Sequence, residues 1–91
     1  KKTMSRKLTI PMQHLDLFAS ILEKMGCDTF VENSSKYSPD FLFSIGSDRF
    51  WGYKRNFLIE FSGDDDSTLQ AINEQYEYVV QQLTKEQETQ D

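Results

Sequence analysis

Apolar residues recur at two different periods along the chain, and the change of period marks the predicted elements. The first period is helical, and its apolar stripe consists of Leu15, Leu17, Phe18, Ala19, Ile21 and Leu22. This spacing predicts a helix over residues 13–25 with one broad buried face. Gly26 follows at the position where a left-handed C-cap is expected.

A second stripe at helical spacing lies near the end of the chain and consists of Leu69, Ile72, Tyr76, Val79, Val80 and Leu83. Asp66 or Ser67 is expected to cap this helix, and the acids at 64–66 favour its positive end. The stripe is lost from Lys85 onward. Residues 85–91 are therefore expected to form a frayed acidic tail.

Between the two helices the apolar period changes to two, which is typical of strands. The predicted strands cover residues 29–32, 41–45, 49–53 and 57–61, and an opening strand within residues 6–12 ends at Pro11. Turn-type segments separate these strands, so we expect an antiparallel meander.

The order of these elements is β-α-β-β-β-β-α, which predicts an α+β fold. Two one-sided helices pack economically on one face of a four- to five-stranded, mainly antiparallel sheet. A chain of 91 residues supports one core, so residues 1–84 are predicted to form a single domain.

Alternation assigns the aromatic segment 49–61 to two faces of this sheet. Arg49, Trp51, Tyr53 and Arg55 share one face, and Phe50, Gly52 and Lys54 share the other. With the helix stripes, the core is expected to contain Phe41, Phe43, Ile45, Phe57, Ile59 and Phe61. The first set is thereby left as a candidate patch on the outer face.

This patch has two interpretations. Trp51 and Tyr53 are either structural residues that a loop or the tail covers, or contact residues for a partner. Flat aromatic faces beside guanidinium groups suit a protein partner and also suit stacked bases. The predicted partner-binding residues are Arg49, Trp51, Tyr53, Lys54 and Arg55.

Charge is divided unevenly along the chain, whose net charge is −5. Residues 1–59 hold nine Lys and Arg against six Asp and Glu, whereas residues 60–91 hold one against nine. The acidic third is poorly suited to a phosphate backbone. It suits an inhibitor that mimics nucleic acid instead.

No stretch of the sequence predicts a catalytic, cofactor or metal site. Cys27 and His14 are the only residues of their types, and we expect a buried structural thiol and a surface or capping imidazole. The acids at 64–66 lack the interleaved spacing of a calcium loop. No apolar run is long enough to span a bilayer, so no membrane partner is expected.

Three stretches together resemble a known family. They are HLDLFASILEKMGC (residues 14–27), GYKRN (52–56) and LQAINEQYEYVV (69–80). They are similar to a conserved cyanobacterial and plastid family of unknown function, represented by the hypothetical chloroplast reading frame (ycf) thirty-five. The chain departs from that family in its Met4-Ser5-Arg6 segment, its shorter length and the missing region after the second helix. The resemblance implies the fold and a cytoplasmic or stromal setting, but no activity.

The sequence therefore predicts a small, non-enzymatic interaction module, an accessory or assembly factor that contacts a protein through an aromatic-basic sheet surface. Three alternatives stay open: RNA or single-stranded nucleic-acid binding through the same surface, a nucleic-acid-mimicking inhibitor of the phage type, and a hydrolase with a cleft that only coordinates reveal. Neither the partner nor the oligomeric state follows from the residues.

Overall fold

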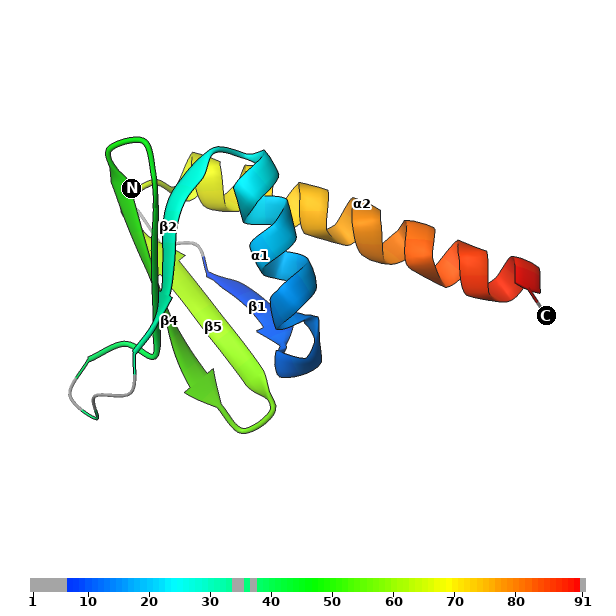
Figure 1. Cartoon of the computed structure of the whole chain (residues 1–91), viewed down its shortest axis with the longest axis horizontal. Helices are drawn as coiled ribbons and strands as arrows, with labels where there is room; N and C mark the ends of the chain where they lie inside the picture. The colour runs from blue at the N-terminus through cyan, green and yellow to red at the C-terminus, as the bar shows by residue number, and fades with distance from the viewer. Residues whose placement is uncertain (1–6, 34–35, 37, 91) are drawn as a thin grey trace, which may run out of the picture.

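The computed structural model describes residues 7–33, 36 and 38–90, and for residues 86–90 it describes the backbone alone. Residues 1–6 of the predicted domain and residue 91 of the predicted tail lie outside this description. The elements in chain order are β1 (Leu8–Pro11), the 3-10 turn η1 (Met12–His14), α1 (Leu15–Lys24), β2 (Cys27–Glu32), β3 (Phe41–Ile45), β4 (Asp48–Arg55), β5 (Leu58–Gly63) and α2 (Asp66–Gln90). The predicted β-α-β-β-β-β-α order is confirmed (Figure 1).

The five strands form one antiparallel sheet in the spatial order β1-β5-β4-β3-β2. Strands β2 to β5 are the expected meander, and β1 joins the sheet beside β5. Pro11 ends β1, and the next backbone N–H, that of Met12, donates a hydrogen bond to the carbonyl of Phe57 at 2.8 Å. Both helices lie on the same side of the sheet (Figure 1).

Helix α1 ends as its sequence predicts. Gly26 has a φ of 92°, a left-handed conformation that glycine adopts without steric cost. The Met25 N–H reaches the carbonyls of Ile21 and Leu22, which tightens the last turn. The chain thereby reverses directly from α1 into β2.

The N-cap of α2 is Asp65, so the prediction of Asp66 or Ser67 was wrong. The Asp65 carboxylate accepts hydrogen bonds from the Ser67 N–H at 3.2 Å and the Thr68 hydroxyl at 2.7 Å. Its carbonyl also accepts from the Leu69 N–H. Capping of this kind satisfies N–H groups that the first turn leaves without helical partners.

Beyond its first turns, α2 extends past the edge of the sheet (Figure 1). Leu69, Ile72 and Tyr76 are buried, whereas Leu83 is exposed. The helix continues to Gln90, beyond the point where the apolar stripe ends. Fraying of the tail from Lys85 stays a prediction.

The core lies between the helices and one face of the sheet. Its buried residues are Leu8, Ile10, Phe18, Ile21, Leu22, Phe41, Phe43, Phe50, Ile59, Phe61, Leu69, Ile72 and Tyr76. Phe18 of α1 stacks on Phe61 with ring centroids 4.7 Å apart, and Phe43 stacks on Phe50 at 4.9 Å. Aromatic rings therefore supply much of the burial that a domain of this size requires.

Two reciprocal Phe–Gly pairs join β4 and β5. Phe50 is opposite Gly63, and Gly52 is opposite Phe61. A Cβ atom on Gly63 would lie 2.0 Å from the Phe50 ring, and one on Gly52 would lie 2.5 Å from the Phe61 ring. Each ring thus occupies the space of the side chain that the opposite glycine lacks.

The structure corrects one predicted core residue, Phe57. Strand β5 begins at Leu58, and Phe57 lies in the two-residue turn after Arg55, where its side chain is 85% exposed. Asn56 takes the first turn position with a φ of 60°, which asparagine tolerates better than most residues. Alternation fails here because the turn interrupts it. Ile59 and Phe61 are buried as predicted, and Ile45 is partly buried.

We expect Phe61→Ala to lower the free energy of unfolding by about 3–5 kcal/mol, because it removes a buried ring that the packed core cannot fully replace. Phe57→Ala, a matched control four residues away, should change it by less than about 0.5 kcal/mol, as is usual for surface positions. Urea denaturation of both variants measures the difference. Equal losses for the two variants would contradict the assigned faces.

Candidate binding site: the outer sheet face

The face of the sheet opposite the two helices is the candidate site, and we call it the outer sheet face. Its side chains are those of Thr9, Thr29, Val31, Leu42, Ser44, Arg49, Trp51, Tyr53, Arg55, Leu58, Glu60 and Ser62. The buried residues of the same strands point the other way, toward the helices. The outer sheet face therefore includes the four residues that alternation assigned to it, Arg49, Trp51, Tyr53 and Arg55.

An apolar row crosses the centre of this face. Strand register places Val31 opposite Leu42 and Leu42 opposite Trp51. Val31 is 51% exposed and Leu42 is 40% exposed, while Trp51 is half-buried. The row presents apolar surface from three adjacent strands to solvent.

Sequence reasoning missed Val31 and Leu42 as members of this surface. The signal was present, because Leu42 lies between the core residues Phe41 and Phe43 and must point away from them. A hollow of about 600 Å³ lies beside the row, and Thr29, Val31, Leu42, Ser44 and Arg49 are among its lining residues.

Charged and aromatic side chains flank the row. Tyr53 is 43% exposed and pairs across the strands with Glu60. The Glu60 carboxylate forms ion pairs with the Arg55 Nε at 3.3 Å and with the Lys7 Nζ at 3.7 Å. The charge of Arg55 is therefore partly neutralised by Glu60. Surface ion pairs of this kind contribute little to the stability of the fold.

Arg49 is held in place through its backbone. Its N–H donates to the Asp64 carboxylate at 3.1 Å, and its carbonyl accepts from the Asp64 N–H at 3.0 Å. These bonds continue the β4–β5 pairing by one residue, and the Arg49 side chain remains exposed. The acid at position 64 thus orders the start of β4.

Lys54, the fifth predicted contact residue, lies on the helix side of the sheet. It pairs with the buried Ile59, and its N–H donates to the Asp40 carboxylate at 2.7 Å. Its Nζ lies 3.5 Å from the Glu32 carboxylate and 5.6 Å from the centre of the Phe41 ring. The five predicted contact residues therefore divide between two faces, because strand side chains alternate.

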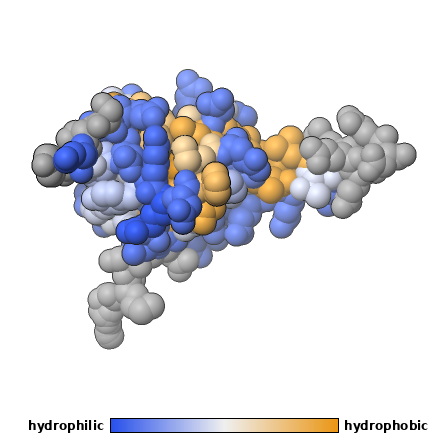
Figure 2. All heavy atoms as spheres, turned by 90° about the horizontal axis from the view of Figure 1, so that it is seen from below, coloured by the Kyte–Doolittle hydropathy of each residue, from blue (hydrophilic) through white to orange (hydrophobic). Residues whose placement is uncertain are grey.

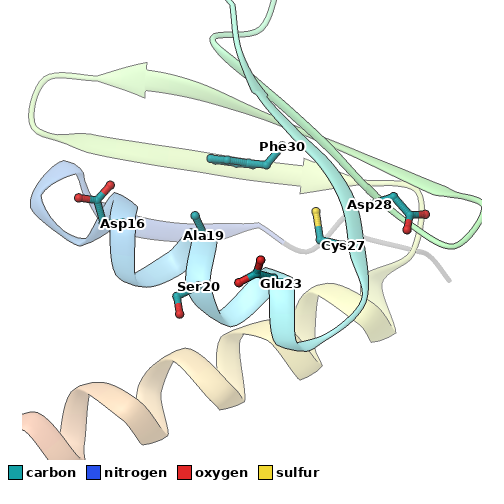
Figure 3. A pocket seen from close by; sticks show the side chains of 7 residues that line it. All are labelled: Asp16, Ala19, Ser20, Glu23, Cys27, Asp28 and Phe30. Atoms are coloured by element: carbon teal, nitrogen blue, oxygen red, sulfur yellow. The ribbon is translucent and has the colours of Figure 1, made fainter.

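A second hollow, of about 430 Å³, lies between α1 and β2 (Figure 3). Asp16 and Glu23 contribute from α1, and Cys27, Asp28 and Phe30 contribute from β2. Figure 3 shows that Asp16 and Asp28 lie at opposite ends and point away from each other. These carboxylates do not converge on one point.

Cys27 is a poor nucleophile in this setting. Burial raises the pKa of its thiol above the ordinary value of 9.0, an effect that Asp28 reinforces and that hydrogen bonds with the backbone of Ser44 and Thr29 oppose. The thiol donates to the Thr29 carbonyl at 3.1 Å. Because its pKa is raised, the Cys27 thiol is protonated at neutral pH. It therefore lacks the thiolate form that nucleophilic chemistry requires.

His14 does not take the surface or capping role that its position predicts. It occupies the N-cap position of α1, but its side chain makes no capping bond. The ring is half-buried, and its Nδ1 is hydrogen-bonded to the hydroxyl of Tyr76, 62 residues away. This contact joins the start of α1 to α2, and burial raises the pKa of the Tyr76 hydroxyl.

Within residues 7–33, 36 and 38–90, no group of three His, Cys, Asp or Glu side chains could hold a metal ion. Two of the consecutive acids have other partners, since Asp64 accepts from the Arg49 backbone and Asp65 caps α2. Across the same described residues, no helix has the length and apolar character needed to cross a membrane.

Comparison of the chain with protein-family models, curated proteins and solved structures finds no match. The resemblance to the chloroplast reading frame family stays a prediction. Its Met4-Ser5-Arg6 segment lies outside the described residues.

Cys27 provides a test of the local geometry. We expect iodoacetamide to alkylate it more slowly in the folded protein at pH 8 than in the chain unfolded in urea, because the raised pKa reduces the thiolate fraction. The difference should persist as the pH rises through 9.0 and shrink once both forms are deprotonated. Mass spectrometry follows the reaction, with Cys27→Ser as the unreactive control. Faster alkylation of the folded protein would contradict the assigned environment.

Proposed function

We propose that this protein is a non-enzymatic interaction module that binds a protein partner through its outer sheet face. One observation carries the proposal: an apolar row on an open sheet face exposes Val31 and Leu42 beside the half-buried Trp51. Contiguous apolar patches of this kind are characteristic of interaction sites.

The chemistry of the face favours protein over nucleic acid. Two of the three residues in its central row, Val31 and Leu42, are aliphatic, and such side chains neither stack on bases nor pair with phosphates. Of the cations on and beside this face, Arg55 and Lys7 are paired with Glu60, and Arg49 lies at the other end of β4. A surface that tracks a phosphate backbone requires more cations than this.

The proposed partner surface has an apolar centre and at least one acidic group at its rim. Trp51, Leu42 and Val31 form the anchor, because aromatic and apolar side chains at the centre of an interface supply most of the affinity. Arg49 and Tyr53 lie at the margin and orient the partner through its acidic and polar groups. A cytoplasmic or stromal location is part of this proposal.

The test is affinity capture from a lysate of the source organism with the wild-type chain as bait. We expect proteins retained by the wild type to be lost with Trp51→Ala and with Leu42→Ser. Tyr78→Ala is the matched control, since Tyr78 is 59% exposed on α2, away from the outer sheet face. For a purified partner, Trp51→Ala should weaken binding at least about tenfold, or 1.4 kcal/mol. Equal affinity for the wild type and Trp51→Ala would refute the site.

Two binding experiments test the alternative functions, nucleic-acid recognition and mimicry of nucleic acid. Binding of fluorescent single-stranded RNA that weakens with salt and is lost with Trp51→Ala would replace the proposal with nucleic-acid recognition. Displacement of DNA or RNA from a basic partner, abolished by charge reversal of Glu74 and Glu77, would instead favour the acidic mimic.

A further inference from the structure

Strand β2 lies at one edge of the sheet. Among the residues that the structure describes, β3 is its only neighbouring strand. The Asn33 N–H donates to the Asp40 carbonyl at 2.7 Å, so residue 33 turns its backbone groups toward β3. Because backbone groups alternate in direction along an antiparallel strand, those of Phe30 and Glu32 point away from the sheet. We call this outward-facing backbone the β2 edge.

The opposite edge of the sheet is less suited to an added strand. Strand β1 has four residues, and Pro11, the last of them, has no N–H to donate. Strand β2 has six residues, and its register shift lies between Cys27 and Thr29, so residues 29–32 pair regularly with β3. Phe30 and Glu32 therefore each offer one N–H and one carbonyl to a further strand, as edge strands do in β-augmentation.

The hollow between α1 and β2 lies beside the β2 edge, and we call it the acidic hollow (Figure 3). Its lining includes three exposed carboxylates, those of Asp16, Glu23 and Asp28, and contains no Lys, Arg or His. The ion pairs of the described residues involve none of the three. Glu32 lies further along β2 and is paired with Lys54 at 3.5 Å. The charges of the acidic hollow are therefore available to a cationic ligand.

The carboxylates are spread along the acidic hollow. Asp16 and Glu23 are separated by about 10 Å along the axis of α1, since each residue advances a helix by about 1.5 Å. Asp28 lies at the end opposite Asp16 (Figure 3). One metal ion cannot contact such a set, whereas an extended chain carries the side chains of one face about 7 Å apart. Long, flexible Lys or Arg side chains at alternate positions can therefore reach successive carboxylates.

We propose that the β2 edge binds an extended basic segment of a partner protein, which joins the five-stranded sheet as a further strand. The residues opposite Phe30 and Glu32 have their side chains on the helix side, because side chains directly opposite each other share a face. At these positions Lys or Arg face the acidic hollow. The residue opposite Val31 lies on the outer sheet face, where an apolar side chain extends the row of Trp51, Leu42 and Val31. The segment therefore alternates basic and apolar residues.

Charge selects a basic occupant and disfavours a second copy of this chain. Joining two β2 edges would bring two acidic hollows together, with the carboxylates of Asp16, Glu23 and Asp28 from both copies near one another. Charged side chains at the edge of a sheet oppose pairing of this kind. The net charge of −5 also attracts cationic segments from a distance.

The β2 edge is separate from the other exposed surfaces of the protein. Figure 2 shows hydrophobic surface passing from the body onto the underside of the projecting helix, and Figure 1 shows that this part of α2 lies away from β2. Trp51, the anchor of the outer sheet face, lies two strands away from an added strand's neighbour β2. Binding at the β2 edge therefore does not rest on the function proposed for the outer sheet face.

Fluorescence anisotropy with a dye-labelled peptide of alternating Lys and Val tests the acidic hollow. Asp16→Asn combined with Glu23→Gln should raise the dissociation constant at least about tenfold, because it removes the charges that face the lysines. Glu74→Gln combined with Glu77→Gln is the matched control, since it removes the same charge from exposed positions on α2. We expect the control to change the dissociation constant less than about threefold, as distant charges are screened by salt.

Two substitutions of Glu32 test the added strand. Glu32→Pro removes the outward N–H and leaves the bonds between β2 and β3 intact, whereas Glu32→Ala removes the same side chain and keeps the N–H. We expect Glu32→Pro to weaken peptide binding at least about fivefold more than Glu32→Ala. Circular dichroism verifies that both variants remain folded. In the wild type, the peptide should slow hydrogen exchange of the Phe30 and Glu32 amides more than that of the Val31 amide, which already faces β3.

The proposal is overturned if the alternating peptide does not bind, or if the double variants of α1 and α2 weaken binding equally. Equal affinities of Glu32→Pro and Glu32→Ala, or unchanged exchange of the Phe30 and Glu32 amides in the complex, also overturn it. Loss of peptide binding with Trp51→Ala would place the peptide on the outer sheet face and contradict the proposal as well. None of these results bears on capture of a partner through the outer sheet face, so the two proposals fail separately.

Discussion

The reciprocal packing of Phe50 on Gly63 and of Phe61 on Gly52 is the constraint on which the other features of this fold depend. Each ring occupies the place of a missing side chain, so β4 and β5 can pair in this register only with these rings on the helix side. A slip of β4 by one residue would turn Phe50 toward solvent and bring Trp51 and Tyr53 into the core. Because side chains alternate along a strand, the positions of the Phe–Gly pairs determine the face on which each of the remaining side chains of β4 and β5 lies.

Two surfaces follow from this one-sided core. Both helices cover the face that carries the phenylalanine rings, so aromatic and aliphatic side chains of the opposite face remain in contact with water. Helix α2 is longer than the sheet that it covers, and its apolar stripe continues into solvent (Figure 1). The proposed partner accounts for the first of these exposed apolar regions.

Local patterns were sufficient to predict the order of the elements, the two helix stripes and the outward position of Trp51 and Tyr53. The same alternation misplaced Phe57, because it was counted through a turn that interrupts the strand. It also placed Lys54 on the face opposite Trp51, where the structure finds it, although Lys54 was counted among the predicted contact residues. The bond between His14 and Tyr76 could not be predicted, since it joins residues 62 positions apart whose proximity depends on the packing of both helices. Asp65 could not be distinguished from Asp66 and Ser67 as the cap of α2, because all three residue types can cap a helix. The choice among them depends on the geometry of the turn before the helix.

The central claim is that Trp51, the single tryptophan, lies on an open sheet face, where a partner can cover it. Quenching of its fluorescence by acrylamide and by iodide measures this directly, in the native protein and in the chain unfolded in urea. We expect both quenchers to reach the native indole, less readily than in the unfolded chain, and the nearby Arg49 to favour the anionic iodide. A native indole that neither quencher reaches would mean that the outer sheet face is covered, and it would contradict this account.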